Sequence, residues 1–470
     1  WLFGRLAEAV AWSRHPKSMK SNPVESLNKR KGLLSMALAL WSLPAIGAPG
    51  DHIGTEGFEV TPELEMLSIY RTNLFLQEGT AGGGAPVTSG AAVQLRPNIG
   101  LRMKGDEADI RLKGGYAARK FLNPDLSNLD RFKDMNLGLK MNLLPNSLVG
   151  VRAFNNFFIS GRETEAVGSD DAYVTHLKEQ GQGTVVIRPG SSLSLDLGGG
   201  VDFDSYQVPE GRNVTGESSL NSRLGYGANA AVDWSFFPKT AFIAGYEMTW
   251  FDWDDNLIDA RGDLAVESEF GDFIGVPDGQ EWQAKGGLRG RLTPKLEVEL
   301  VGGFGKLLYD EGSVAEDDSS ADADSSELDG SVAGFAEDVD TFAEGFLLDV
   351  GIRYLVNEGT NIVLGYERGF EDVFFTNFVG FDTARISIES RLADRLLLTP
   401  QFGYRLEKYV GEVSRDDHLL RARFNVEYSL TSYLFLKSGV WWIRRASADG
   451  AHPEMEYDDV HIRAGLTLVY

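Results

Sequence analysis

Charged side chains recur at every second position within segments that are otherwise apolar, and this spacing is the main chemical signal of the chain. In the segment 457–470, Asp459, His461 and Arg463 alternate with apolar residues such as Val460 and Ile462. A period of two places the two sets on opposite faces of a β-strand. Such a strand has one charged face that suits water or ions, and one apolar face that suits a core or a lipid bilayer.

The same parity assigns charged residues of many other segments to the wet face. A charged side chain that faces lipid costs roughly 2 to 4 kcal/mol at the bilayer midplane, so this many arginines in strands indicate a hydrated interior. We predict that they line a lumen, where they either brace the wall as ion-pair ladders or form a lining that favours anionic solutes. The predicted lumen residues are Arg96, Arg102, Arg111, Lys113, Arg223, Lys285, Arg289, Arg291, Arg353, Glu367, Arg385, Glu389, Arg391, Arg405, Arg421, Arg423, Glu427, His461 and Arg463.

No arrangement of residues in the sequence predicts catalysis. Only His461, of the six histidines, lies at a clear wet-face position of a strand. The sequence contains no HExxH zinc motif, no phosphate-binding glycine loop and no nucleophile elbow. Because cysteine is absent, a disulfide scaffold and a thiolate metal site are excluded. We therefore predict no enzymatic activity, no cofactor and no metal site, and we expect His461 to hydrogen-bond its neighbours in the wall.

These residues must be positioned by long strands that are joined in pairs. Alternating segments of ten to sixteen residues begin near Gly57 and continue to the end of the chain. Within each pair the turn is short, as at 145–147, 188–190, 237–239, 293–295, 357–359, 393–394 and 430–432. Between pairs the connections are longer, as at 77–89, 123–130, 161–171, 207–218, 252–280, 310–340, 411–416 and 447–456. Short turns that alternate with long loops are typical of a transmembrane barrel.

We predict an all-β fold, a transmembrane antiparallel up-and-down β-barrel of about 18 strands over residues 57–470, with 16 strands as the alternative. The first segment and the segment 173–188 have the weakest alternation. A soluble β-sandwich or β-solenoid is the other alternative, but soluble strands average roughly five or six residues and these are longer. The strands begin near Gly57, Gly90, Glu107, Arg131, Ser147, Tyr173, Ser191, Ser219, Thr240, Glu281, Lys295, Thr341, Thr360, Gly380, Arg395, Asp417, Ser432 and Tyr457.

Aromatic and acidic residues are both concentrated at particular places. Trp250 and Phe251, and later Trp441 and Trp442, lie toward strand ends, where interfacial girdles are expected. The formal net charge of −24 opposes nucleic-acid binding, which needs a basic surface. Acidic residues fill the loops 252–280 and 310–340. We expect the second loop to be a solvated surface segment; cation binding is the alternative, although its spacing matches no calcium loop.

The N-terminus has the features of a targeting segment. Lys29, Arg30 and Lys31 precede an apolar run over 32–43, which is followed by small residues up to Ala48. This pattern predicts a signal peptide over 19–48 that is cleaved near Ala48, whereas a single-span anchor is disfavoured by the short apolar run. Residues 1–18 are expected to be an upstream artefact, and 49–56 a short periplasmic lead-in.

The C-terminal third resembles a known family. The runs 405–428 and 433–470, with Arg444-Arg445-Ala446-Ser447 before Glu456-Tyr457-Asp458-Asp459, resemble the putative beta-barrel porin 2 family of Gram-negative outer-membrane proteins. Residues 69–75 resemble the opening motif of that family, with Arg71 and Thr72 in place of its usual acidic pair. The resemblance implies an integral outer-membrane barrel, often encoded near exopolysaccharide loci, and it implies no catalytic residues.

We therefore expect an outer-membrane channel for hydrophilic solutes or for exopolysaccharide export in a Gram-negative bacterium. A non-conducting structural or adhesive barrel with acidic surface loops is the alternative. The expected partners are outer-membrane lipid and the barrel assembly machinery, with polysaccharide export components as a further candidate and no nucleic acid. The chain ends on Tyr470, and barrels resembling this one present a terminal aromatic residue as their assembly signal.

Overall fold

The computed structural model describes ten stretches of the chain: residues 53–55, 57–74, 88–163, 173–207, 219–253, 278–309, 342–373, 376–410, 415–448 and 456–470. All of them belong to one compact unit, Pro49–Tyr470. The predicted signal peptide and the segment before it lie outside the described residues, as do the acidic loop 310–340 and most of the loop 252–280. Among the described residues, no helix is long and apolar enough to cross a membrane.

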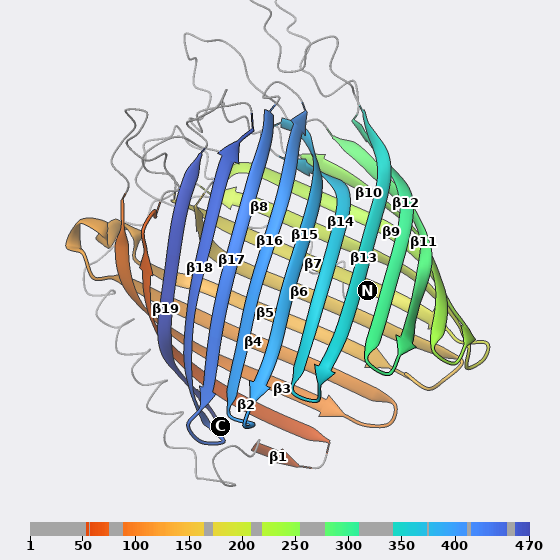
Figure 1. Ribbon diagram of the computed structural model, residues 1–470, viewed down its shortest axis with the longest axis horizontal. Helices are drawn as coiled ribbons and strands as arrows, with labels where there is room; N and C mark the ends of the chain where they lie inside the picture. The colour runs from red at the N-terminus through yellow and green to blue at the C-terminus, as the bar shows by residue number, and fades with distance from the viewer. Residues whose placement is uncertain are drawn as a thin grey trace, which may run out of the picture. The chain divides into compact units, whose positions relative to one another are not determined.

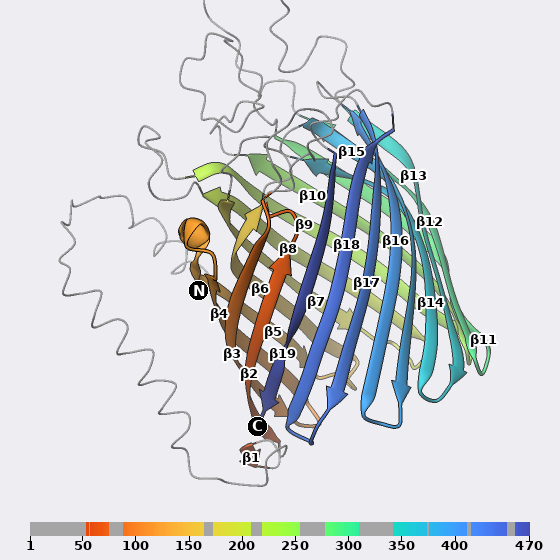
Figure 2. The same cartoon turned by 60° about the vertical axis from the view of Figure 1, so that its left-hand side comes forward.

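Eighteen long strands, β2 to β19, form one closed antiparallel sheet, because each strand pairs with the next and β19 pairs back onto β2. Figures 1 and 2 show the resulting barrel of tilted strands, with β19 beside β2. The predicted eighteen-stranded barrel is confirmed, and the alternative of sixteen strands is wrong. The strands are β2 (Phe58–Arg71), β3 (Gly90–Lys104), β4 (Ala108–Phe121), β5 (Arg131–Leu143), β6 (Val149–Glu163), β7 (Tyr173–Ile187), β8 (Leu193–Gln207), β9 (Ser219–Phe237), β10 (Thr240–Trp253), β11 (Gly279–Thr293), β12 (Leu296–Tyr309), β13 (Phe342–Asn357), β14 (Thr360–Val373), β15 (Thr376–Leu392), β16 (Leu396–Val410), β17 (Arg415–Ser429), β18 (Leu434–Ser447) and β19 (Tyr457–Val469).

Two short elements accompany the barrel. A three-residue strand, β1 (Ile53–Thr55), pairs with the start of β2 through the hairpin that places Thr55 opposite Phe58. A 3-10 helix, η2 (Pro124–Leu129), lies in the connection between β4 and β5. Its N-cap is Asn123, whose side-chain carbonyl accepts a hydrogen bond from the Asp125 amide at 3.1 Å. The cap supplies a partner to one of the amides that a helix start leaves unpaired.

The outer surface of the barrel is built by the apolar parity of each strand. Leu95 of β3, Leu300 of β12 and Phe402 of β16 are 41%, 51% and 46% exposed, respectively, and they alternate with polar neighbours. Exposure of so many large apolar side chains would be unfavourable in water, because a contiguous apolar surface promotes association. The same surface is the one that a lipid bilayer solvates.

Every short turn that the sequence predicts joins two neighbouring strands, but one of the opposite connections departs from the predicted alternation. β14 ends at Val373 and β15 begins at Thr376, so the connection on the long-loop side is only two residues long. The ladder continues to its last pair, Val373 opposite Thr376, after a register irregularity. The two strands are therefore paired over almost their whole length, which leaves no residues for a long loop.

Candidate functional site

The strand register places all the predicted lumen residues on one face of the closed sheet. Residues directly opposite each other in an antiparallel ladder project to the same face. Arg423 lies opposite Trp441, Trp441 opposite His461, and His461 opposite Arg71, and the same relation continues around the barrel. The residues lie on β3 (Arg96, Arg102), β4 (Arg111, Lys113), β9 (Arg223), β11 (Lys285, Arg289, Arg291), β13 (Arg353), β14 (Glu367), β15 (Arg385, Glu389, Arg391), β16 (Arg405), β17 (Arg421, Arg423, Glu427) and β19 (His461, Arg463).

Contacts that skip a strand identify this charged face as the concave one. Arg445 of β18 bonds Glu407 of β16 at 2.6 Å, and Arg152 of β6 bonds Asp196 of β8 at 3.0 Å, in each case across the strand between them. Strands lie about 4.8 Å apart, so the backbones in each pair are separated by roughly 10 Å. Side chains converge over that distance only on the inside of a curved sheet. The charged face is therefore the inner wall of the barrel.

Many of the predicted arginines are paired with carboxylates on the same strand, on the next strand or one strand further along. Arg102 contacts Asp109 at 3.2 Å, and Arg291 contacts Glu297 at 2.6 Å. Exposed pairs of this kind contribute only about 0 to 1 kcal/mol each, so they orient the side chains more than they stabilise the fold. The other paired residues of the predicted set are Arg96 with Glu65, Arg111 with Asp109, Lys113 with Glu63, Arg223 with Asp202, Arg289 with Asp233, Arg405 with Glu371 and Glu407, and Glu427 with Lys437.

A second group has no oppositely charged partner within 4.0 Å among the described residues. Its cationic members lie on β11, β13, β15, β17 and β19, and its acidic members on β14 and β15. Charges that remain unpaired on a concave wall must be solvated by water or by a passing solute. This second group consists of Lys285, Arg353, Arg385, Arg391, Arg421, Arg423, Arg463, Glu367 and Glu389.

Two of the aromatic residues that the sequence assigned to interfacial girdles, Phe251 and Trp441, lie on the inner wall. Trp441 packs edge-on against His461, with 4.4 Å between ring centroids and an interplanar angle of 87°. Phe251 is only 3% exposed, and the Arg223 guanidinium lies 5.2 Å from its ring centroid. Both belong to the charged parity, and their neighbours Trp250 and Trp442 therefore occupy the outer face. Adjacent aromatics in a strand necessarily point to opposite faces.

The sequence gives weaker signals for two buried polar clusters on the inner wall. In the first, the Arg445 side chain, 4% exposed, contacts Glu407 at 2.6 Å and Asp417 at 3.3 Å. The Tyr409 hydroxyl donates to Glu407 at 2.8 Å. Arg445 and Asp417 could have been assigned by parity, but only the register brings them together.

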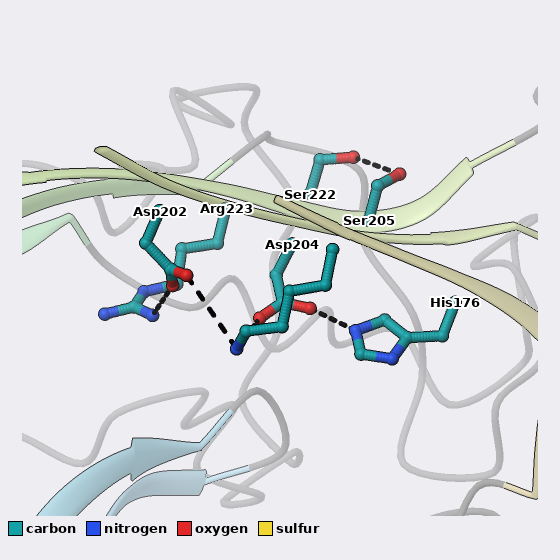
Figure 3. Close-up of polar contacts among 7 residues, drawn as sticks. His176, Asp202, Asp204, Ser205, Ser222 and Arg223 are labelled. Atoms are coloured by element: carbon teal, nitrogen blue, oxygen red, sulfur yellow. Dashed lines mark hydrogen bonds and ion pairs between the residues drawn. The ribbon is translucent and has the colours of Figure 1, made fainter. Parts of the chain in front are cut away.

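The second cluster joins β7, β8 and β9, and Figure 3 shows its members. His176 bonds Asp204, which also accepts from Lys178 at 2.6 Å. The neighbouring Ser205 accepts a hydrogen bond from Ser222 at 3.0 Å, on the other face of the sheet. A histidine, an aspartate and a serine therefore lie close together without forming a catalytic triad, because alternation directs the serine away from the histidine.

Part of the inner wall encloses a cavity of about 690 Å³, lined by residues of β6 and of β8 to β15. Its charged lining includes the predicted Lys285, Arg289 and Glu367, together with Asp349 and Glu299. Because Asp349 and Glu367 are directly opposite in the β13–β14 ladder, two like charges face each other there. Such a pair is unfavourable unless water or a cation screens it. The cavity therefore has room for water or a cation beside these two carboxylates.

The motif near the start of the chain lies at the seam where the barrel closes. Arg71 of β2 contacts Asp459 of β19 at 2.7 Å, and the Thr72 amide donates to the Val460 carbonyl at 3.0 Å. The two segments that carry the family resemblance therefore contact each other, although Arg71 and Asp459 are 388 positions apart in the sequence.

The C-terminal part of the chain is similar to a known protein family. Residues 339–470 match the family described as putative beta-barrel porin 2. The matched region contains β13 to β19, and the resemblance noted in the sequence is confirmed for it. None of the curated proteins matches the chain.

Solved structures with a similar arrangement include outer-membrane proteins of Pseudomonas. OpdK from Pseudomonas aeruginosa is 9% identical with a TM-score of 0.42, and the alignment covers 88% of this chain and 99% of that one. OpdQ from the same organism is 9% identical with a TM-score of 0.43 and coverages of 88% and 98%. A BenF-like porin from Pseudomonas fluorescens Pf-5 is 11% identical with a TM-score of 0.43 and coverages of 87% and 99%.

Proposed function

We propose that this protein is a channel for hydrophilic solutes in the outer membrane of a Gram-negative bacterium. The observation that carries the proposal is the division of one closed sheet into an apolar outer face and a charged inner face. Several arginines of the inner face have no acidic partner within 4.0 Å among the residues that the structure describes. A barrel of 16 to 18 strands is wide enough for an aqueous pore. The match of residues 339–470 to a porin family supports the same conclusion.

The solute class has two candidates, small hydrophilic solutes and exopolysaccharide. Export of exopolysaccharide is implied by the family resemblance and would require polysaccharide export components as partners. The partners common to both candidates are outer-membrane lipid and the barrel assembly machinery, to which Tyr470 would be presented. Tyr470 lies directly after β19, and its amide donates to the Pro62 carbonyl of β2 at 2.9 Å.

Conductance of the full chain in planar lipid bilayers tests the proposal. We expect discrete current steps whose size rises with salt concentration, as in a water-filled pore. Protein that folds into the bilayer, as judged by heat-modifiable migration on a gel and a strand-rich circular dichroism spectrum, but gives no current steps in any salt would refute the channel.

The second candidate is a non-conducting barrel with a structural or adhesive role. The ion pairs that skip a strand favour it, because they tie the inner wall together and reduce the open cross-section. Lys113 of β4 reaches Glu63 of β2 at 3.5 Å, and Lys437 of β18 reaches Glu65 of β2 at 3.8 Å. The absence of current from folded protein would select this candidate.

A further inference from the structure

We propose that Arg423, Trp441 and Arg463 form a binding site for oxyanions on the inner wall, a claim that rests on the proposed channel function and names its solute class. The recognised group is a carboxylate, sulfate or phosphate. The three residues come from the neighbouring strands β17, β18 and β19. The Arg423 and Arg463 guanidinium carbons lie 4.4 and 4.5 Å from the centroid of the Trp441 ring.

A glycine makes this arrangement possible. Arg463 lies directly opposite Gly439 of β18, so no side chain separates it from β17. Its Nη2 atom reaches across to the Asn425 Oδ1 atom of β17 at 3.4 Å. A Cβ atom at Gly439 would lie 3.3 Å from the Arg463 Nε atom and 2.7 Å from the Asn425 Oδ1 atom. Arg463 therefore crosses the strand through the space that the glycine leaves.

The acidic residues nearby are already paired with other cations. On β19 and β2, Asp459 is bonded to Arg71, and Glu65 is shared by Arg96 and Lys437. The other inner-face acidic residues of β16, β17 and β2 are paired too, as Glu407 and Asp417 with Arg445, Glu427 with Lys437, Glu59 with Arg102 and Glu63 with Lys113. Arg423 and Arg463 have no carboxylate within 4.0 Å in the described part of the chain, and neither does the exposed Arg421.

Stacking on an aromatic ring suits a guanidinium for anion binding. The ring contacts the flat face of the guanidinium, whereas the N–H groups point outward in its plane. Because both guanidinium carbons lie over the Trp441 ring and His461 packs against that ring in a T-shaped arrangement, the two arginine side chains are restrained before an anion binds and lose less freedom when it does. Two such guanidiniums, with no carboxylate within 4.0 Å of either among the described residues, can each form paired charge-assisted hydrogen bonds to an oxyanion. The arrangement thus recognises an anionic group.

The oxyanion could belong to a small solute or to an acidic polysaccharide, and the probes separate these sources. Citrate represents the first source, an oligogalacturonate the second, and maltoheptaose is the uncharged control. The half-blocking concentration of each probe is measured in planar bilayers, and its binding to the detergent-folded full chain is measured by isothermal titration calorimetry. Calorimetry needs no conductance, so it tests the site even if the channel proposal fails.

Three variants test the site, and a fourth controls for charge. The double variant Arg423→Gln with Arg463→Gln should weaken citrate binding by about tenfold or more. A roughly tenfold loss of affinity corresponds to the lower end of the free energy that a hydrogen bond to a charged group contributes. Gly439→Ala should weaken it in the same direction without any change in charge, and Trp441→Leu should do so by releasing both guanidiniums. Arg152→Gln removes one cation from β6, far around the barrel. In 1 M salt, where the Debye length is about 3 Å, this control should change the affinity for citrate by less than about twofold.

Each outcome decides between the hypotheses. Current that citrate blocks equally in the wild type and in the double variant would overturn the site and leave the channel intact. Absence of current, combined with calorimetric citrate binding that the double variant loses, would refute the channel and support the site. Binding of oligogalacturonate without citrate would support the site and assign a polymeric source. Equal binding of maltoheptaose and oligogalacturonate would overturn it, because sugar stacking rather than charge would then explain the affinity.

Discussion

Removal of the Asp459 carboxylate should destabilise the barrel at the seam where its first and last strands meet. Asp459 is 1% exposed. Its Oδ2 atom accepts from the Arg71 Nε and Nη2 atoms at 3.0 and 2.7 Å, and its Oδ1 atom accepts from the Asn73 amide at 3.0 Å and the Thr72 hydroxyl at 3.3 Å. Four donors from the end of β2 therefore converge on one side chain of β19.

The magnitude follows from what Asp459→Ala would leave behind. The Arg71 side chain is 14% exposed, so its guanidinium would lose a carboxylate partner in a largely desolvated place. Breaking a buried ion pair by removing one partner costs about 3 to 5 kcal/mol. The part-exposed arginine places this case near the lower end, about 3 kcal/mol, which corresponds to a roughly hundredfold change in the folding equilibrium. Asp459→Asn keeps an acceptor for the Asn73 amide and should cost less.

The adjacent residue provides a matched control. Asp458 points to the opposite face, where its Oδ1 atom accepts from the Trp442 indole N–H at 2.7 Å in an exposed position. Asp458→Ala should therefore cost only about 0.5 to 1.5 kcal/mol. The free energy of unfolding is measured by urea titration of the protein folded into lipid vesicles. If Asp459→Ala cost no more than Asp458→Ala, the convergence of donors at the seam would not be stabilising, and the reasoning would be refuted.

Three other perturbations have definite expected outcomes. Gly287→Ala should lower the free energy of unfolding by about 1 to 3 kcal/mol in the urea titration, because its Cβ atom would lie 2.1 Å from a backbone carbonyl oxygen of β12. Gly183→Ala is the control and should be close to neutral, because its Cβ atom would meet nothing within 4 Å. Equal losses of stability in the two variants would contradict this prediction. Ala393→Gly should stabilise the β15–β16 turn by about 1 kcal/mol, since Ala393 has a φ of 49°, and a loss of stability would count against that strain. Deletion of Tyr470 should lower the amount of barrel in the outer membrane, as measured by immunoblot of membrane fractions, and normal levels would show that it is not the assembly signal.

The strand count and the strand positions could be predicted because both depend on local pattern. The predicted starts at Gly90, Arg131 and Thr360 coincide with the observed ones, and even the start near Gly380 is only four residues from the start of β15. Each long strand must keep one apolar face toward lipid, so the two-residue period persists from end to end. Where a strand ends is less certain, because pairing can continue into a connection, as it does between β14 and β15.

The partners of each inner-wall residue could not be predicted in the same way. Parity indicated that Arg463 faces the lumen, but not that it crosses β18 over Gly439 to reach Asn425. Nor could it indicate that His176 meets Asp204, because the alternation of β7 is poor and the contact depends on the register with β8. Contacts of this kind require the register of two or three strands to be known together, and no local pattern contains that information.

Alternation along the chain predicted a barrel of about 18 strands and, in the clearly alternating segments, the face to which each side chain points, because alternation is a property of the extended backbone alone. The choice between 18 and 16 strands came from the pairing of the strands in the closed sheet. Only the folded sheet shows which charges neutralise each other and which inner-wall charges have no oppositely charged partner within 4.0 Å in the described part of the chain. Asp459 illustrates the difference: its parity is visible within β19, but its partner Arg71 belongs to β2 at the other end of the barrel sheet. Closure of the sheet brings the two strands together, and the curvature of the closed sheet brings side chains into contact across an intervening strand.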